Sequence, residues 1–451
     1  MNKLEAFKAY DIRGEWGRDL DSALVYKIGY FLPQVLHAGN MLVGWDDRLS
    51  SNEAQQALTR GINDAGCDVT LAGRSTTPMI YWGTGKFGFD ASIMITASHN
   101  PKNHNGLKVS GKGVLPVGYD NGLKTVEQLI LSDAAIKPGR RGGSASMDLQ
   151  RHYLEFLSAY TSDFGNLKIA IDGSNGMAGL FTRQLFGKDP IYLNNEPDGT
   201  FPGHDPNPLN PKNQDQIKQA VLQNHCDIGL IFDGDADRVM FIDEKGHFIS
   251  PDLVIALLGH YFFEERKQTG TVVQDIRTSK SVAEYLAKKF DAKVETWRVG
   301  RAYGATKLKE LDGVYGGELA GHYYFRDFYY SDSGLLAALF VLQIVSKFKS
   351  AGTCLSDAIK NISAYANTGE VNFKVEKKQW VMDEVKRYFD EHEPPLKFYD
   401  FDGYRLEFED WWFNIRPSNT EPYLRFLAEA KSRELLDEKT RLIYDIVEKY
   451  A

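Results

Sequence analysis

The sequence predicts an α/β fold in which three similar α/β units with mixed sheets are followed by an α+β unit at the C-terminus. Short apolar runs alternate with amphipathic segments over most of the 451 residues, and this alternation starts afresh along the chain. The pattern is typical of sheets that carry helices on both faces. The last part of the chain loses the alternation. A chain of this length exceeds one ordinary hydrophobic core, so roughly two to four domains are expected.

The first unit is expected to span residues 1–145. Three short apolar runs predict its strands: Met41–Trp45, Asp68–Ala72 and Ala91–Ile95. Asn52–Ala65 between them is predicted to be a helix. A stretch rich in Gly, Ser and Arg, Gly139–Ser146, then interrupts the pattern and indicates where the unit ends.

The second and third units, expected over residues 146–250 and 251–366, repeat the same alternation. Four apolar runs predict their strands: Lys168–Asp172, Ile228–Phe232, Val272–Gln274 and Val294–Arg298. Three amphipathic or apolar segments predict helices: Gln214–Gln223, Asp252–Phe263 and Ser279–Lys289. The regular return of strand and helix is what indicates an α/β architecture in both units.

The fourth unit, residues 367–451, has strands and helices without regular alternation. Its predicted strands are Val371–Val375, Tyr404–Glu409 and Leu424–Ala428. Its predicted helices are Gln379–Glu391 and Ser432–Lys449. We therefore expect an α+β unit here.

Composition excludes several classes of protein. The net charge of −8 and the pI of about 5.8 argue against a nucleic-acid partner, although a local basic cluster could still bind an anionic small molecule. Met1–Gly14 lacks the apolar stretch of a signal peptide, and the longest apolar run, Gly334–Val345, is short for a membrane span and predicts a buried helix. The widely spaced Cys67, Cys226 and Cys354 predict neither disulfides nor a metal site. We expect a cytoplasmic protein with no membrane partner.

A polar loop follows the predicted strand Ala91–Ile95. It contains Ser98 with His99 beside it, and Lys108 follows shortly after. Open α/β sheets bind ligands beyond the carboxyl ends of their strands, and an exposed serine there could carry a covalent group. The alternative is an ordinary polar turn, because Ser, Asn and Pro are common turn residues.

Three carboxylates at alternate positions follow the predicted strand Ile228–Phe232: Asp233, Asp235 and Asp237. They cannot all stay ionised at such spacing without a cation, and their hard oxygen ligands suit Mg²⁺. An acidic surface turn is one alternative. An EF-hand is another, with Glu244 at its twelfth position, but Arg238 stands where that loop requires glycine.

Two further loops have the composition of binding loops. Gly316–His322 is rich in glycine, and its Glu318 could accept hydrogen bonds from sugar hydroxyls. In Arg416–Pro422, Arg416 could clamp a phosphate. The side chains expected to complete that phosphate cradle are Ser418, Asn419 and Thr420. Taken singly, each loop could also be an ordinary strand end or polar turn.

All four loops in this order make the chain resemble the α-D-phosphohexomutase family, and within it the bacterial phosphomannomutase/phosphoglucomutase group. Three more segments carry the resemblance: Lys8–Gly14, Gly44–Ser51 and Asp198–His204. The resemblance covers nearly the whole chain. It implies four domains around one central cleft, with one loop contributed by each.

The resemblance also implies a mechanism. Ser98 would be phosphorylated, and one Mg²⁺ would be held by its phosphate and by Asp233, Asp235 and Asp237. Arg238 and Lys108 would stabilise charge on the transferred phosphoryl group. The phosphoserine would convert a hexose monophosphate into a hexose 1,6-bisphosphate, which is also the expected activator.

Other residues would bind the sugar phosphate or move protons. Glu318 would hold the sugar hydroxyls, and the phosphate clamp of Arg416, Ser418, Asn419 and Thr420 would lie across the cleft from Ser98. Four residues are candidates for the general acid or base: Arg13, His99, Lys108 and His322.

Three features bear on the substrate, two of them in the loop Gly316–His322, called the sugar loop here, and one directly after it. Ala320 stands where the family usually has serine, and Leu319 differs from the glutamine of the phosphoglucosamine branch. Tyr323–Phe328 is similar to phosphomannomutases. We therefore expect interconversion of mannose 1-phosphate and mannose 6-phosphate, with glucose phosphates or both sugars as the alternative.

Two other functional classes are weighed against the mutase. In a phosphatase of the haloacid-dehalogenase type, Asp233 would be the nucleophile, but the Ser98 loop would have no role. A catalytically silent sugar-phosphate-binding protein would not need Ser98 or the three aspartates. Both a monomer and a homodimer are compatible with the sequence.

Overall fold

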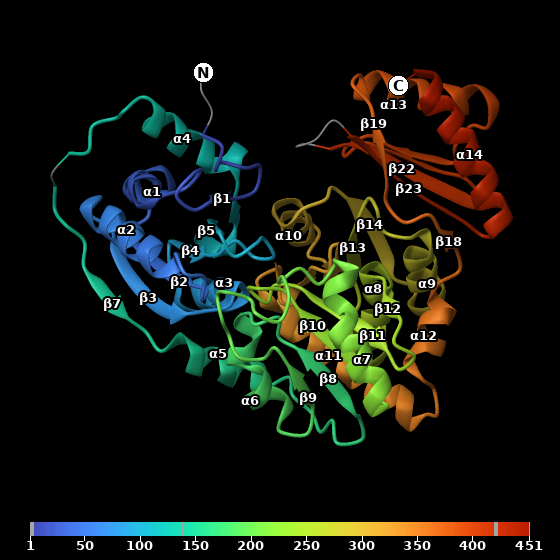
Figure 1. The fold of residues 1–451 in the computed structure, drawn as a ribbon, viewed down its shortest axis with the longest axis horizontal. Coiled ribbons are helices and arrows are strands. Elements are labelled where there is room, and N and C mark those ends of the chain that lie inside the picture. Colours follow the sequence, from blue (N-terminus) through green and yellow to red (C-terminus); the bar gives the residue numbers. More distant parts are fainter. Residues whose placement is uncertain (1–3, 138, 419–422, 451) are drawn as a thin grey trace.

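Four sheets, each with its own helices, make up the structure, a computed structural model that describes residues 4–137, 139–418 and 423–450. Figure 1 shows these four units, called I to IV here in chain order, with I and IV at the two upper corners and II and III below them. Three of the sheets are mixed and the last is antiparallel. The predicted fold class is therefore confirmed.

Unit I contains a seven-stranded mixed sheet in the order β1-β5-β4-β2-β3-β7, with β6 paired to β5. Its strands are β1 (Ile12–Glu15), β2 (Asn40–Trp45), β3 (Asp68–Arg74), β4 (Ala91–Ile95), β5 (His104–Gly111), β6 (Pro116–Val117) and β7 (Ser144–Ser146). The stretch Gly139–Ser146, expected only to interrupt the pattern, thus adds edge strand β7, which pairs with β3.

Helices cover both faces of the first sheet. They are α1 (Ser22–Leu36), α2 (Ser51–Asp64), α3 (Thr77–Phe87) and α4 (Lys124–Leu131). Successive strand residues point to opposite faces: Met41 of β2 shares a core with α1, α2 and α4, whereas Leu42 shares a core with α3. The core that contains α3 continues into units II and III, so α3 is where unit I is packed against the rest of the molecule.

Units II and III repeat a five-stranded mixed sheet, in the orders β12-β11-β10-β8-β9 and β14-β13-β15-β16-β17. Unit II contains β8 (Ile169–Asp172), β9 (Ile191–Leu193), β10 (Ile228–Phe232), β11 (Val239–Asp243), β12 (Phe248–Ile249), α5 (Leu149–Ser158), α6 (Thr182–Phe186) and α7 (Asp215–Asn224). Unit III contains β13 (Thr271–Asp275), β14 (Lys293–Trp297), β15 (Tyr315–Gly317), β16 (Tyr323–Phe325), β17 (Ser331–Asp332), α8 (Pro251–Gly259), α9 (Lys280–Phe290), α10 (Arg301–Glu310), α11 (Gly334–Ser350) and α12 (Leu355–Ile362). The predicted helix Asp252–Phe263 is α-helical only to Gly259 and continues as a π-helical turn, His260–Glu265.

Unit IV is an antiparallel sheet in the order β18-β23-β22-β21-β20, with β19 also paired to β23. Its strands are β18 (Ala366–Asn367), β19 (Val371–Lys374), β20 (Lys397–Tyr399), β21 (Tyr404–Glu407), β22 (Trp411–Pro417) and β23 (Tyr423–Ala430). The helices α13 (Lys378–His392) and α14 (Arg433–Tyr450) share its apolar core.

The sequence pattern did not reveal several of these elements, among them α1, α3, α10, β5 and β22. Helix α1 contains Gly29 and Pro33, which weaken a helical prediction. Helix α3 is buried from Thr77 to Thr84, so it lacks the polar face of an amphipathic helix.

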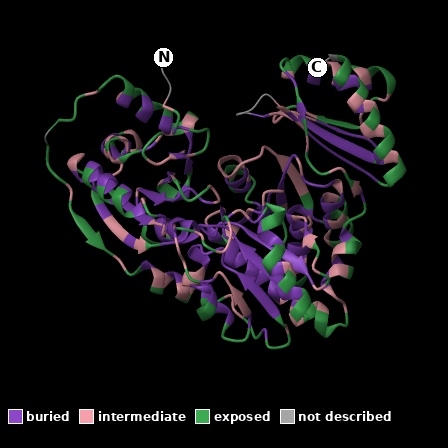
Figure 2. Cartoon of the chain, in the orientation of Figure 1, coloured by how far each residue is buried: buried purple, intermediate pink, exposed green. Residues whose placement is uncertain are grey.

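Burial is concentrated at the sheets and at the junction of units I, II and III, as Figure 2 shows. The apolar run Gly334–Val345 lies in α11, whose residues are buried along most of its length, as predicted. Among the described residues, no single helix has the length and apolar composition to cross a membrane, and one bent pair, α11 with α12, passes that test only when taken together.

Candidate active site

Ser98 lies in the loop that follows β4, with a left-handed backbone (φ 51°) and little exposure. Its backbone N–H donates to Oγ1 of Thr96 at 2.9 Å. The hydroxyl donates to Oδ2 of Asp233 at 2.9 Å and lies 3.3 Å from Nδ1 of His99. The serine loop of unit I and the aspartate loop of unit II are therefore in direct contact, and the contact is made by the two side chains that the sequence singled out.

The aspartate loop forms a compact cluster of carboxylates between β10 and β11. Asp233, Asp235 and Asp237 each offer an oxygen, and these oxygens all lie within 4.8 Å of one another. All three residues are buried. One oxygen each of Asp235 and Asp237 has no hydrogen-bond partner among the described residues. Buried carboxylate oxygens need a partner, so this donor set fits a hard divalent cation.

Two side chains of unit I reach the same cluster. Nζ of Lys108, on β5, lies 2.6 Å from Oδ2 of Asp235 and also donates to Asp237. Burial lowers the pKa of Lys108, but the two carboxylates outweigh it and raise the pKa above its ordinary value, so the ammonium stays charged. The hydroxyl of Thr77, at the start of α3, donates to Oδ2 of Asp235.

Arg238 connects the cluster to unit III. Its Nε donates to Oδ2 of Asp233 at 2.9 Å, and its backbone pairs with that of His322 in an isolated antiparallel bridge. Nδ1 of His322 lies 3.9 Å from Oδ1 of Asp237 and 2.6 Å from Oδ2 of Asp332. Burial lowers the pKa of His322, yet these carboxylates raise it overall.

Glu318 lies in the glycine-rich loop after β15, and its two carboxylate oxygens have different surroundings. Its Oε1 accepts from the backbone N–H of Gly300 at 3.2 Å and from the hydroxyl of Tyr324. Its Oε2 lies 4.0 Å from the guanidinium of Arg277. Burial raises its pKa. The second oxygen is the one left for a ligand.

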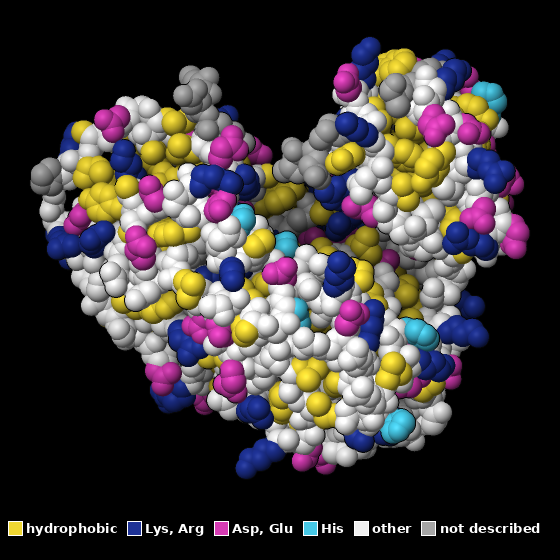
Figure 3. Space-filling view, in the orientation of Figure 1, with side chains coloured by type: hydrophobic (Ala, Val, Ile, Leu, Met, Phe, Trp, Pro, Cys, Tyr) yellow, Lys and Arg dark blue, Asp and Glu magenta, His cyan; other side chains and the backbone are white. Residues whose placement is uncertain are grey.

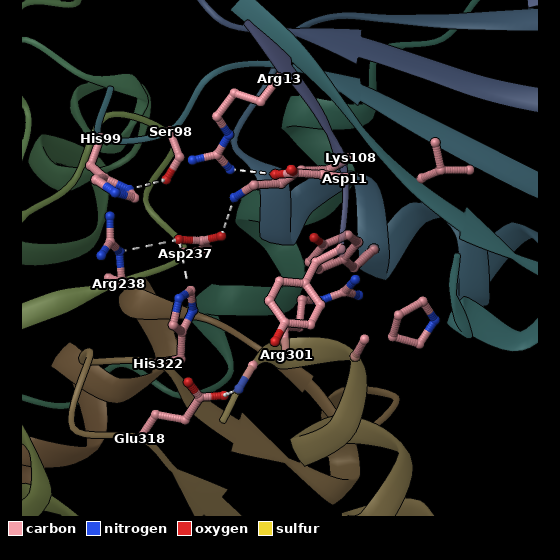
Figure 4. Close-up of a pocket in the computed structure, with 16 residues that line it drawn as sticks. Asp11, Arg13, Ser98, His99, Lys108, Asp237, Arg238, Arg301, Glu318 and His322 are labelled. Atoms are coloured by element: carbon pink, nitrogen blue, oxygen red, sulfur yellow. Dashed lines mark hydrogen bonds and ion pairs between the residues drawn. The ribbon is translucent and has the colours of Figure 1, made fainter. Parts of the chain in front are cut away.

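Several of these side chains line a cavity of about 150 Å³ (Figure 4). Units I, II and III all contribute to its wall. The expected site residues on it are Arg13, Ser98, His99, Lys108, Asp237, Arg238, Glu318 and His322. Arg13 donates to Oδ1 of Asn100 at 3.0 Å and pairs with Asp11. Burial and the neighbouring Arg238 lower the pKa of His99 well below its usual range.

The expected phosphate clamp is not part of this cavity wall. Arg416 lies on β22 of unit IV and pairs with Glu370 at 3.5 Å, and Arg425, opposite it on β23, reaches the same carboxylate at 3.6 Å. Burial, and next the nearby Arg277, lower the pKa of Arg416. The surface is hollowed between units I and IV, with Lys and Arg side chains facing the hollow (Figure 3).

Only part of the clamp falls within the described residues. The hydroxyl of Ser418 is buried and has no hydrogen-bond partner in the described part of the chain. It is therefore suited to donate a hydrogen bond to a bound anion. Asn419 and Thr420 lie outside the described residues.

Sequence analysis missed several residues of the cavity and its surroundings: Tyr10, Arg48, Thr77, Arg277, Arg301 and Asp332. Arg301, one of these residues, packs over the ring of Tyr81 at 3.6 Å and pairs with Asp332 at 3.1 Å. Arg277 pairs with Asp275 at 2.7 Å. Arg277 could have been found from the sequence, because the charged pair Asp275 and Arg277 directly follows the predicted strand Val272–Gln274. Asp332 has no comparable local signal.

Comparisons with known proteins agree with this architecture. Models of the phosphoglucomutase/phosphomannomutase α/β/α domains I, II and III match residues 4–135, 151–246 and 250–365, and the model of the C-terminal domain matches residues 370–444. The phosphomannomutase of Vibrio cholerae serotype O1 is 34% identical over 100% of this chain and 99% of its own. That of Methanocaldococcus jannaschii is 32% identical over 99% of this chain and 98% of its own.

A solved structure shows the same likeness in three dimensions. The crystal structure of a phosphoglucomutase/phosphomannomutase family protein from Burkholderia thailandensis has a TM-score of 0.87 with this chain at 26% identity. The match covers 99% of this chain and 98% of that one. Fold and comparisons together define an isomerase of the phosphohexomutase class. More particularly, the chain belongs to the phosphoglucomutase/phosphomannomutase family, which confirms the resemblance read from its loops.

Proposed function

We propose that this protein is a magnesium-dependent phosphomannomutase that interconverts mannose 1-phosphate and mannose 6-phosphate through a phosphorylated Ser98. The contact between Ser98 and Asp233, inside a cluster of three buried aspartates, carries the proposal. It pairs a nucleophile with the ligands of a divalent cation, which is what a phosphoserine carrier requires. The names of the relatives support mannose phosphate as the substrate.

The metal site would consist of Asp233, Asp235, Asp237 and the Ser98 phosphate. A bound Mg²⁺ supplies charge stabilisation at the transferred phosphoryl group. Around it, Arg238 and Lys108 add two cations that already contact the same carboxylates. Transfer of a phosphoryl group is chiefly a problem of positioning and charge, so these fixed cations are the main catalytic contribution of the chain.

The reaction balances as two transfers. In the first, the bond between Ser98 Oγ and phosphorus breaks, a hydroxyl oxygen of the hexose monophosphate bonds to phosphorus, and a hexose 1,6-bisphosphate forms. The hydroxyl proton passes to a base in the cavity, and Ser98 Oγ regains a proton. Nδ1 of His99 lies 3.3 Å from Oγ of Ser98, so His99 is our candidate for the residue that moves this proton. The second transfer reverses these steps at the other phosphate.

The intermediate must turn around between the transfers, so the sugar has to be held in two orientations. Glu318 lines the cavity, and its Oε2 lies 4.0 Å from the guanidinium of Arg277. We assign the sugar hydroxyls to this carboxylate. We assign the phosphate that is not reacting to Arg416, Ser418, Asn419 and Thr420. All these residues come from one chain, so the mechanism is compatible with either a monomer or a homodimer. The proposed location is the cytoplasm.

An assay with purified protein tests the proposal. Mannose 1-phosphate and glucose 1-phosphate are supplied separately with Mg²⁺ and a trace of the matching 1,6-bisphosphate, and intact mass reports the phosphorylation of Ser98. We expect faster turnover of mannose phosphate, one phosphate per chain in the wild type and none in Ser98→Ala. Phosphate that persists in Ser98→Ala, or is released by hydroxylamine as an aspartyl phosphate would be, refutes the carrier. Faster turnover of glucose phosphate refutes only the sugar assignment.

A further inference from the structure

Arg48 is a buried arginine with no part in the mechanism described so far. It lies between β2 and α2, in the Gly44–Ser51 segment that carries the family resemblance. The exposed fraction of its side chain is 0%. Burying a guanidinium is unfavourable unless its N–H groups all find acceptors. Its partners therefore indicate what it holds in place.

The guanidinium donates all five of its N–H groups, and four of them go to backbone carbonyls of the Ser98 loop and of the first residue of β5. The four carbonyl acceptors are those of Ser98 (2.8 Å), Asn100 (2.7 Å), Pro101 (2.6 Å) and His104 (3.1 Å). The fifth group, Nε, donates to Oδ2 of Asp46 at 3.1 Å. One side chain thus binds the segment Ser98–His104 at four points, and Asp46 orients that side chain.

The Ser98 loop needs such support because its backbone is strained. A φ of 51° is unfavourable for serine, so external contacts must hold it. Arg48 binds the Ser98 carbonyl on one side. Gly234 of the aspartate loop packs against the same carbonyl, since an added Cβ on Gly234 would lie 2.5 Å from it. The orientation of this peptide determines where the Ser98 hydroxyl points, which is toward Asp233.

Unit II covers the guanidinium from the other side. The ring of Phe201 lies 5.0 Å from the guanidinium carbon of Arg48. Gly199, in the same Asp198–His204 segment, approaches the backbone so closely that an added Cβ would lie 1.9 Å from the carbonyl of Asp47. The segment therefore packs directly on the turn that carries Arg48 and shields its charge-assisted hydrogen bonds from water.

We propose that Arg48 is the positioning residue of the serine loop, and that the Asp198–His204 segment is its cover. The inference rests on the proposed function, in which Ser98 carries the phosphate. None of the five hydrogen bonds of the Arg48 guanidinium goes to the side chain of a proposed metal ligand. Arg48 acts through the Ser98 carbonyl, which keeps the hydroxyl in line with the aspartate cluster while phosphate is passed in either direction.

The test is Arg48→Lys, which keeps the charge but offers its N–H groups from a single nitrogen that does not span the four carbonyls. A misplacement of about 1 Å costs roughly a hundredfold in rate, so we expect kcat to fall about a hundredfold. KM for the sugar phosphate should change by less than about threefold, because Glu318 and unit IV are untouched. Transfer from preformed phosphoenzyme to sugar phosphate in a single turnover should slow to the same extent as kcat.

Leu58→Ala is the control, because Leu58 is a buried residue of α2 and its truncation opens a cavity in the core of unit I. It should lower the melting temperature and leave kcat unchanged when both variants are assayed below their melting temperatures. Wild-type kcat in Arg48→Lys, or an equal loss of kcat in Leu58→Ala, overturns the positioning role. If Arg48→Lys does not fold, Phe201→Leu decides the question. That variant should lower kcat about three- to tenfold at constant KM, and wild-type kcat overturns the proposal.

Measurement of intact mass distinguishes failure of the proposed function from failure of the role proposed for Arg48. If Ser98→Ala still acquires phosphate, the proposed function fails, and with it the purpose assigned to the loop. If Ser98 is phosphorylated in the wild type while Arg48→Lys keeps full turnover, only the role of Arg48 fails.

Discussion

The backbones of Arg238 and His322 pair in an isolated antiparallel bridge, which joins the aspartate loop of unit II to the sugar loop of unit III. The bridge brings Nδ1 of His322 to 3.9 Å from Oδ1 of Asp237. Residues proposed to bind metal and residues proposed to bind sugar therefore form one continuous surface. Neither loop could move far without carrying the other.

Thr77 is expected to support metal binding although it is not a ligand. Its hydroxyl donates to Asp235, and its backbone N–H donates to the Asp235 carbonyl at 3.0 Å. Thr77→Val keeps the shape and removes the hydroxyl. Loss of a partner that orients a metal ligand typically costs about ten- to a hundredfold in affinity, so the Mg²⁺ concentration for half-maximal activity should rise by that factor.

Two further variants make the Thr77 result specific. Thr77→Ser restores a hydroxyl and should restore affinity. Thr84→Val, on the same helix, removes a hydroxyl that hydrogen-bonds with the Ile80 carbonyl and the Ser92 hydroxyl instead, and should leave the Mg²⁺ dependence unchanged. An unaltered Mg²⁺ titration of Thr77→Val would show that Asp235 needs no such support.

Arg416→Ala tests the phosphate clamp. If Arg416 binds the phosphate that is not reacting, its contact is present in both ground state and transition state, so the loss should appear mainly in KM. A hydrogen bond to a charged group contributes roughly 1.5–3 kcal/mol, which corresponds to a fall in kcat/KM of about ten- to a hundredfold. Arg433→Ala, an exposed arginine of the same unit, is the control. Unchanged steady-state kinetics for Arg416→Ala would move the phosphate site elsewhere.

Ala320→Ser tests how the sugar loop recognises hydroxyls. Ala320 lies two residues from Glu318, in a turn that the backbone N–H of Gly321 closes on the Glu318 carbonyl at 2.9 Å. A serine there adds a hydrogen-bonding group near the sugar. A net gain of about 0.5–1.5 kcal/mol corresponds to a KM lower by about two- to tenfold. Ala320→Val adds bulk without a hydroxyl and should not lower KM. If both variants raise KM, the side chain at this position does not face the sugar.

Glu429 makes the contact between units III and IV sensitive to pH. Ser279 of unit III donates to it at 2.6 Å, and Trp412 donates to the same carboxylate at 2.8 Å. Burial, and next the charge of Asp252, raise the pKa of Glu429 to about 7. Between its unfolded pKa and about 7, the folded state holds more protons than the unfolded state, so stability falls as pH rises through this window.

The effect on stability is at most about 1.4 kcal/mol for each pH unit in that window. Calorimetry from pH 5 to 8 should show the unfolding temperature of the protein falling with pH in the wild type relative to Glu429→Gln, which has no ionisable group at this position. Glu438→Gln, exposed on α14, should behave like the wild type. Parallel curves for the wild type and Glu429→Gln would mean that Glu429 does not titrate in this range.

Much of the fold could be predicted because most strands are short, apolar and separated by polar loops. Strands β4 and β10 were predicted with the bounds that the structure has. Helix α1 was missed because Gly29 and Pro33 weaken a helical prediction, and helix α3 because its burial from Thr77 to Thr84 removes the polar face that marks a surface helix. The outer strand β7 was missed because Ser144–Ser146 has no apolar residue pattern, and only its pairing with β3 makes it a strand.

The four loops could be recognised from local sequence, because each lies at the end of a strand and its functional residues are consecutive or nearly so. Ser98 with His99 and the run Asp233–Asp237 are examples. Other contacts became visible only in the folded chain: Lys108 donates to Asp235, Asp332 pairs with His322, and Arg48 binds the serine loop. These contacts join segments far apart in the chain, and they depend on how the sheets dock, which no local pattern of residues records.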